Sequence, residues 1–352
     1  MSSTTGKITD WVDPKSSTGE FKRQVSSFRS FISRGPGSKF PPEAGRYHIF
    51  VSYACPWAHR TLITRKLKGL EDVISFSVVH WNLGEGGWRF PTSEDIAQAG
   101  QDGLGEGMNA EGIVKGAPLE GMEDYTHLRQ VYFSADTDYS GRYTVPVLWD
   151  KKEKTIVSNE SSEIIRMLYT EFDDLLDPKY KSPQVDLFPG SLQSQIEETN
   201  SWTYDNINNG VYKSGFATTQ SAYNKAVTAL FEHLDKAEKH LSTVSSEGPF
   251  YNGKSITEAD IRLYVTLIRF DPVYVQHFKC NIRDIRSGYP RLHKWMRNLY
   301  WNVPAFGQTT DITHIKNHYT RSHKQVNPLG ITPLGPLPNI LPLDEEVRAV
   351  KT

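Results

Sequence analysis

The chain has 352 residues, and its 40 Lys and Arg against 41 Asp and Glu give a formal net charge of -1. A charge so close to zero argues against a dedicated nucleic-acid binder, which needs a basic surplus to contact phosphates. The length exceeds the usual size of one hydrophobic core, so we expect two domains. No stretch has the roughly 18 consecutive apolar residues of a membrane helix, and we expect a soluble protein without a membrane partner.

The chain has two cysteines, Cys55 and Cys280. Two cysteines cannot form the disulfide framework of a secreted scaffold, which favours a reducing compartment, and we expect a cytoplasmic protein. The N-terminus has no apolar core of a secretory signal. A mitochondrial presequence is the alternative because Ser, Thr and Lys are frequent there, but the acidic residues Asp10, Asp13 and Glu20 argue against it.

Residues 1–42 are predicted to form a polar N-terminal arm with a few aromatic anchors, among them Trp11. A β-type run at 47–51 follows, then a helical segment at 61–68 and a second β-type run at 73–79. Strand, helix and strand at this spacing predict a βαβ unit with a parallel pair of strands.

A glycine-rich insertion, about 82–142, interrupts this domain. It shows little apolar periodicity, and a structureless insertion of this length is unusual and either functional or mobile. Two short β-type runs at 143–149 and 155–157, around a charged turn, then predict a hairpin. Ser158 to Glu163 offer caps and acidic residues for a helix that we expect to run through Tyr169.

The second half of the chain is predicted to be helical. A segment rich in Asp, Pro and Lys, at 173–189, is typical of a linker between domains. Residues 257–260 have the spacing of a capping box, and the tail after Pro328 is rich in Pro and Gly and should be extended. Helices with apolar residues three and four apart are expected at 196–207, at 221–241, after the capping box and at 290–301.

Cys55 is the leading candidate for chemistry. It lies between a predicted strand and a predicted helix, and Pro56 suits the first turn of that helix. The helix N-terminus favours a thiolate, so we expect a pKa below the free value of about 8.5, and His59 and Arg60 could add positive potential. A buried structural cysteine is the alternative. Because Ala58 stands where a second cysteine would resolve a disulfide, a mixed disulfide with an external thiol is favoured.

Two further motifs suggest a ligand with peptide character. Pro146 has no backbone N–H to donate, and it opens a predicted strand. A cis bond between Val145 and Pro146 would leave the backbone of Val145 free to pair with an extended ligand. The helix N-terminus at Ser161 suits a carboxylate, and Glu160 could accept from an ammonium group. A proline at an edge strand and an ordinary capped helix are the alternatives.

Taken in order, these motifs resemble the glutathione transferases with a cysteine active site. The closer resemblance is to the glutathionyl-hydroquinone reductases, also called the Xi class, which is related to the omega class. The motifs shared with the cysteine glutathione transferases are Cys55–Arg60, Val145-Pro146, Glu160-Ser161 and Thr257–Asp260. The features that point to the Xi class are the lead-in at 11–31 and the segments Gly87–Phe90, Asn208–Ala217, His314–Tyr319, Ser322–Lys324 and Asn327-Pro328.

The resemblance implies an α/β plus all-α fold. A thioredoxin-like, glutathione-binding domain would span 43–172, with the insertion at about 82–142, and an all-helical domain would span 190–327. Residues 328–352 would form an extended C-terminal tail. The family usually dimerises, so a homodimer is implied as well.

The resemblance also implies roles for individual residues. Cys55 would be the catalytic thiol. Glutathione would be contacted by Trp88, Arg89, the main chain of Val145, Glu160 and Ser161. The aromatic substrate would lie against Tyr204, Tyr319 and, as a weaker match, Tyr212.

The implied activity is the cleavage of glutathionyl-hydroquinones, with glutathione as co-substrate. Cys55 would attack the thioether sulfur, and a second glutathione would resolve the mixed disulfide to oxidised glutathione. One alternative is an omega-like transferase that acts on disulfides or dehydroascorbate, and another is a non-catalytic interaction module of the same fold. No metal is expected, because His314 and His318 lack partners at zinc spacing and suit a surface or structural role.

Overall fold

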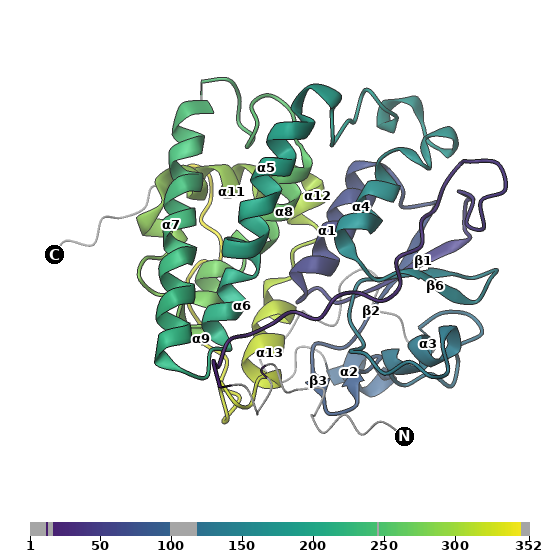
Figure 1. Ribbon diagram of the computed structural model, residues 1–352, viewed down its shortest axis with the longest axis horizontal. Coiled ribbons are helices and arrows are strands. Elements are labelled where there is room, and N and C mark those ends of the chain that lie inside the picture. The colour runs from purple at the N-terminus through teal and green to yellow at the C-terminus, as the bar shows by residue number, and fades with distance from the viewer. Residues whose placement is uncertain (1–11, 13–16, 99–117, 245, 346–352) are drawn as a thin grey trace. The chain divides into compact units, whose positions relative to one another are not determined.

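The computed structural model describes residue 12 and residues 17–98, 118–244 and 246–345 (Figure 1). Trp11 and the part of the insertion between 99 and 117 lie outside the described residues. The chain divides into two compact units. Unit 1 includes Arg23–Asp186 and Thr309–Ser322, and unit 2 includes Asp10–Lys22, Leu187–Gln308 and His323–Thr352.

Unit 1 contains a four-stranded mixed sheet with the strand order β2-β1-β5-β6. β1 and β2 are parallel, as the βαβ pattern predicts, whereas β1 pairs with β5, and β5 with β6, in antiparallel fashion. All residues of β1 are buried, which is typical of a central strand covered on both faces. The strands are β1 (Tyr47–Val51), β2 (Ser75–Val78), β5 (Val147–Asp150) and β6 (Thr155–Ser158).

Helices α1 (Pro56–Leu67) and α4 (Ser161–Thr170) pack against each other on one side of this sheet. The expected helix at 61–68 thus begins earlier, because Pro56 is accepted at the first helical position. Gly69 ends α1 in the left-handed region, with φ +60°, where a side chain would also meet the ring of Tyr180.

The described parts of the insertion carry regular structure, so the expectation of a structureless segment is wrong for them. The strands β3 (Leu83–Gly84) and β4 (Gly87–Trp88) form a small ribbon. Helices α2 (Ser93–Gln98) and α3 (Leu128–Ala135) lie on the side of the sheet opposite α1 and α4 (Figure 1). α3 buries Leu128, Val131 and Tyr132, an apolar face at helical spacing, and this burial explains why it folds.

Two short turns of 3-10 helix, η1 (Asp173–Leu175) and η2 (Pro178–Tyr180), occupy the expected linker. The last helix of unit 1 comes from far along the chain. This helix, α13 (Ile312–Ser322), packs against β3.

The elements of unit 2 in its described residues are helices, as expected. Both halves of the capping box before α8 are present, and the carboxylate of Asp260 accepts from the backbone N–H of Thr257 at 2.9 Å. The elements are η3 (Gly190–Leu192), α5 (Gln193–Thr203), the π-helix η4 (Tyr204–Asn208), α6 (Gly210–Gly215), α7 (Gln220–Val244), α8 (Glu258–Leu267), the π-helix η5 (Phe270–Tyr274), α9 (Val275–His277), α10 (Ile285–Gly288), α11 (Pro290–Asn302) and α12 (Pro304–Gly307).

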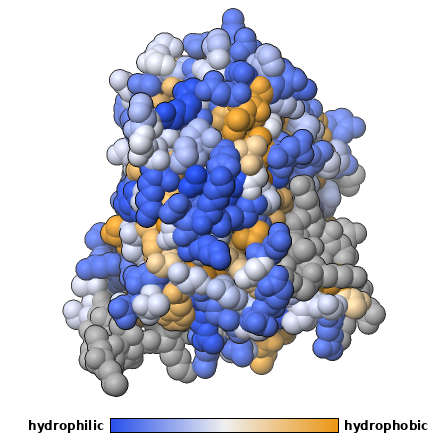
Figure 2. All heavy atoms as spheres, turned by 90° about the vertical axis from the view of Figure 1, so that its right-hand side faces the viewer, coloured by the Kyte–Doolittle hydropathy of each residue, from blue (hydrophilic) through white to orange (hydrophobic). Residues whose placement is uncertain are grey.

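The tail has neither helix nor strand in its described part, 328–345. It is fixed by side chains of α11: the indole N–H of Trp301 donates to Leu341 O, and Arg297 donates to Glu345 O. The face shown in Figure 2 is largely hydrophilic, with hydrophobic side chains in small separate groups. Such scattered groups are normal on a protein surface and do not mark a site.

Candidate functional site

Cys55 is the N-cap residue of α1 and directly precedes Pro56. Its backbone is extended, with φ −78° and ψ 117°, and its N–H donates to the carbonyl oxygen of Ser52 at 3.1 Å. Cys55 as a residue is neither fully buried nor fully exposed. The first turn of α1, all of which the structure describes, holds no acidic residue. The sulfur therefore faces the positive end of a helix with no opposing carboxylate in that turn, which suits a thiolate.

Val145 lies against this sulfur. The Cys55 thiol donates to the carbonyl oxygen of Val145, with Sγ and the oxygen 3.3 Å apart. The bond between Val145 and Pro146 is cis, and β5 begins only at Val147. Because Pro146 has no N–H, the ladder of β5 does not include this position. The structure thus brings together the thiol and a stretch of backbone that lie 90 residues apart in sequence.

Glu160 is the N-cap residue of α4. Its carboxylate accepts from the backbone N–H and the hydroxyl of Ser162, at 3.1 and 2.9 Å, and from the hydroxyl of Ser26 at 3.0 Å. Burial opposes ionisation, but these hydrogen bonds prevail and lower the pKa of Glu160. Ser161 is buried, with its hydroxyl 3.5 Å from a guanidinium nitrogen of Arg60. The α4 N-terminus therefore combines an ionised carboxylate with backbone donors.

Positive charge gathers around α1. The guanidinium groups of Arg23 and Arg60 lie 4.1 and 4.5 Å from the centre of the Trp57 ring, which is cation–π geometry. His59 is fully buried, and its Nε2 lies 2.9 Å from the hydroxyl of Thr309. Of the two residues expected to add positive potential near Cys55, Arg60 carries a full charge, whereas His59 forms a buried contact.

Trp88 and Arg89 follow one another in the insertion but have different surroundings. Trp88 is buried in β4 and stacks on His318 of α13, with ring centres 4.8 Å apart. The guanidinium of Arg89 forms two hydrogen bonds with Asp95, at 2.5 and 2.7 Å, and these bonds lower the pKa of that carboxyl. A ligand that reaches Arg89 therefore meets a guanidinium already paired with a carboxylate.

Helix α13 carries Tyr319 and supports the Cys55 loop. The Nε2 of His314 lies 3.3 Å from the hydroxyl of Ser52, the residue whose carbonyl accepts from the Cys55 N–H. His318 lies 2.8 Å from the carbonyl oxygen of Trp81 through Nδ1 and stacks on Trp88. Tyr319 and both histidines are buried, so the structural role suggested for the histidines is right and the surface role is wrong. No local pattern predicts these contacts, because they join residues more than two hundred positions apart.

The other two candidate tyrosines belong to unit 2. Tyr204 begins η4 and is about one-third exposed, at 36%. Tyr212 is buried in α6, where its ring lies 6.2 Å from that of Phe21 and 5.4 Å from that of Phe278. The N-terminal arm therefore contributes an aromatic side chain to the packing of Tyr212.

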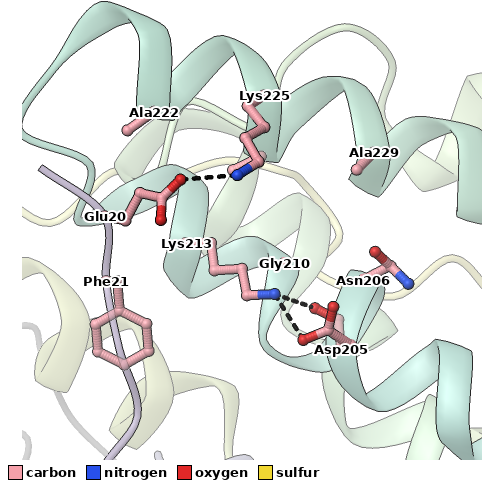
Figure 3. A pocket seen from close by; sticks show the side chains of 10 residues that line it. Glu20, Phe21, Asp205, Asn206, Gly210, Lys213, Ala222, Lys225 and Ala229 are labelled. Carbon is pink, nitrogen blue, oxygen red and sulfur yellow. Dashed lines mark hydrogen bonds and ion pairs between the residues drawn. The ribbon is translucent and has the colours of Figure 1, made fainter. Parts of the chain in front are cut away.

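Unit 2 also contains a cavity of about 180 Å³ beside η4 and α7 (Figure 3). Its two lysines are paired with carboxylates of the same lining: Lys225 with Glu20 at 2.9 Å, and Lys213 with Asp205 at 2.7 Å. Figure 3 marks both pairs with dashed lines and shows Phe21 next to Glu20 on the same segment. Because each lysine already has a carboxylate partner, the lining does not indicate a class of ligand.

Among the residues that the structure describes, no group of three or more His, Cys, Asp or Glu side chains is arranged to hold a metal ion. None of the described helices is both long and apolar enough to cross a bilayer.

Comparisons with known proteins agree with this arrangement. Residues 54–171 match the N-terminal domain of glutathione S-transferases, and residues 220–298 match the C-terminal domain. The chain is 54% identical to glutathione S-transferase omega-like 2 of Schizosaccharomyces pombe, over 95% of this chain and 97% of the relative. It is 47% identical to the glutathionyl-hydroquinone reductase YqjG of Escherichia coli, over 93% and 92%.

Among solved structures, the chain resembles the Xi glutathione transferase ECM4 of Saccharomyces cerevisiae in complex with glutathione. The two share 51% identity and a TM-score of 0.83, over 93% of this chain and all of that one. The chain belongs to the glutathione S-transferase family, in its Xi class. The expected family, the thioredoxin-like plus helical fold class and a glutathione-dependent enzyme are thereby confirmed.

Proposed function

We propose that the protein is a glutathionyl-hydroquinone reductase and that Cys55 is its catalytic thiol. The observation that carries this proposal is the contact between the Cys55 sulfur, at the N-terminus of α1, and the backbone of Val145. A helix N-terminus favours the nucleophilic thiolate, and a backbone segment beside it that lies outside the β5 ladder suits an extended tripeptide. The name of the Escherichia coli relative supports the same activity.

The candidate residues suit the cysteinyl centre and the γ-glutamyl end of glutathione. The main chain of Val145 would pair with the cysteinyl backbone, which would set the glutathione sulfur next to Cys55. Glu160 would accept from the γ-glutamyl ammonium group, and Ser161 with the α4 N-terminus would hold the carboxylate. The further proposed contacts are Trp88 and Arg89 for glutathione, and Tyr204, Tyr319 and Tyr212 for the hydroquinone ring.

The proposed reaction has two steps. The Cys55 thiolate attacks the sulfur of the thioether, an S–S bond forms and the C–S bond breaks, and the ring carbon takes a proton. A ring held as its keto tautomer makes that carbon a better leaving group, and a tyrosine hydroxyl such as that of Tyr319 would supply the proton. A second glutathione thiolate then attacks the mixed disulfide, which releases oxidised glutathione and restores Cys55. The ring carbon is reduced as its C–S bond becomes a C–H bond, and the thioether sulfur and the thiol of the second glutathione are together oxidised to the disulfide.

A single-turnover experiment tests this sequence. The protein is mixed with an equimolar glutathionyl-hydroquinone and no free glutathione, and hydroquinone is measured by chromatography. We expect one equivalent of hydroquinone and a glutathione adduct on Cys55 in the peptide mass spectrum. Addition of glutathione should remove the adduct and start turnover. Hydroquinone release without an adduct on Cys55 would contradict the mechanism.

The same experiment addresses the omega-like alternative. A thioltransferase or dehydroascorbate reductase needs Cys55 but has no need to cleave a carbon–sulfur bond. Reduction of a glutathionylated peptide or of dehydroascorbate, without any hydroquinone release, would therefore favour that alternative.

We further propose that the enzyme is a cytoplasmic homodimer whose glutathione-binding and helical domains span 43–172 and 190–327. Sedimentation equilibrium with the full chain gives the mass of the assembly, and twice the chain mass is the expected result. A monomer across the micromolar range would contradict the dimer.

A further inference from the structure

The two backbone segments proposed to hold glutathione are joined by one side chain, that of Tyr132. Its hydroxyl donates to the carbonyl oxygen of Thr144 at 2.8 Å and accepts from the Thr144 N–H at 3.1 Å. It also accepts from the side-chain amide of Asn159 at 3.2 Å. Thr144 directly precedes Val145, and Asn159 directly precedes Glu160. One phenol therefore links the segment before β5 with the segment before α4.

The two segments satisfy every hydrogen-bonding position of the Tyr132 hydroxyl. A phenol has one donor and accepts through two lone pairs: the donor goes to Thr144 O, and the lone pairs accept from the Thr144 N–H and the Asn159 amide. The Thr144 hydroxyl also lies 3.2 Å from the Tyr132 hydroxyl. Asn159 is held from its other side as well, because its amide oxygen accepts from the Phe28 N–H at 3.1 Å. Burial raises the pKa of Tyr132, so the phenol remains a neutral donor at physiological pH.

The ring of Tyr132 is fixed by other aromatic side chains. Its centre lies 5.9 Å from the ring of Phe28, 4.8 Å from that of Tyr139 and 5.6 Å from that of Tyr143. Tyr132 itself is fully buried. It belongs to α3, so this link is supplied by the insertion that interrupts the thioredoxin-like domain.

We propose that Tyr132 is a positioning residue for glutathione. Its hydroxyl sets the spacing between the Val145 main chain and the Glu160 carboxylate, so that the cysteinyl centre and the γ-glutamyl end of one glutathione fit both at once. The insertion then has a defined task, since α3 fixes the geometry of the glutathione site from outside it. The inference rests on the proposed function, in which Val145 and Glu160 bind the same ligand.

Tyr132→Phe tests the proposal, with Tyr139→Phe as the matched control. Both substitutions remove one hydroxyl from the same aromatic cluster, but the Tyr139 hydroxyl donates to Arg142 O and accepts from Ser27, and it bonds with neither Thr144 nor Asn159. We expect the glutathione dissociation constant of Tyr132→Phe to rise about three- to tenfold by calorimetry. Its kcat at saturating glutathione should stay within about twofold, because the ligand once bound meets the same thiol.

A second variant covers the case in which Tyr132→Phe does not fold. Asn159→Ala leaves the phenol in place and removes one of its donors, so it should also weaken glutathione binding. The two losses should be less than additive in the double variant, because both break the same link. Glutathione binding of Tyr132→Phe equal to that of Tyr139→Phe, or fully additive losses, would overturn the proposal.

The outcomes also separate this proposal from the proposed function. If the wild-type protein binds glutathione without cleaving the thioether, the proposed reductase activity fails, and the contrast between the two phenylalanine variants still decides the role of Tyr132. If the wild-type protein cleaves the thioether and both variants bind glutathione equally, only the role of Tyr132 fails.

Discussion

The two cysteines of this chain lie in different units and in contrasting surroundings. Cys55 in unit 1 is partly exposed at the N-terminus of a helix. Cys280 in unit 2 is fully buried, its thiol lies 3.7 Å from the carbonyl oxygen of Phe278, and burial raises its pKa. The difference teaches that the backbone position of a thiol, and its access to water, decide whether it can act as a nucleophile.

Loss of the proposed catalytic thiol should have the largest effect. Cys55→Ala removes the nucleophile, and we expect hydroquinone release to fall by at least about a thousandfold in a steady-state assay. Cys280→Ala is the matched control and should keep its kcat while losing some stability from the small cavity that it creates. Equal activity of the two variants would remove the functional contrast between the cysteines.

Alkylation measures the same contrast without substrate. Iodoacetamide should modify Cys55 at least about a hundredfold faster than Cys280 in the native protein, because only Cys55 combines exposure with a helix N-terminus. Peptide mass spectrometry after timed quenching gives both rates. In denaturant the two rates should converge, since the difference arises from the fold; rates that already agree in the native state would contradict the contrast.

Substitutions near Cys280 should change the free energy of unfolding and leave the reactivity of Cys55 unchanged. Gly215 of α6 packs so closely against Phe278 that a Cβ there would overlap its ring, so Gly215→Ala must displace the aromatic packing. We expect a loss of about 1–3 kcal/mol in the free energy of unfolding, measured by urea denaturation. Gly210→Ala in the same helix is the control, because its Cβ would lie 3.4 Å from Leu230. Alkylation of Cys55 should be unchanged in both variants.

Local signals explain which parts of the fold could be predicted. β1 was predicted from a run of β-type residues, α4 from its caps and acidic first turn, and α8 from the spacing of Thr257 and Asp260. Each of these signals lies within a few residues of the element that it predicts. The motifs at Cys55 and Glu160 are local in the same sense, because each lies at the start of a helix.

The contacts that could not be predicted join distant parts of the chain. His314 reaches Ser52 across 262 positions, and nothing near His314 in sequence marks that partner. Tyr132 is similar, because its hydroxyl joins Thr144 with Asn159, while its own helix lies in an insertion for which the sequence predicts no regular structure. The sequence predicted the residues proposed to meet the ligand but not the buried side chains that set their spacing.

The smallest expected effect concerns the carboxylate of Glu160. Glu160→Gln should weaken glutathione binding by about tenfold, because a neutral amide replaces a charged acceptor for an ammonium group.

The same carboxyl should make stability depend on pH. The pKa of Glu160 in the folded protein lies below the ordinary value of 4.5, so its ionisation stabilises the fold above that pH. This contribution is lost only as the pH falls through the lower folded value. The difference in unfolding free energy between the wild type and Glu160→Gln should therefore be constant from pH 7 to pH 5 and shrink in stronger acid. Glu163→Gln is the matched control, because Glu163 lies in the first turn of the same helix but its carboxylate pairs with Arg29. The glutathione affinity of this variant should match that of the wild type. Equal losses in both variants would show that the total charge at this helix end matters, and not the Glu160 carboxylate itself.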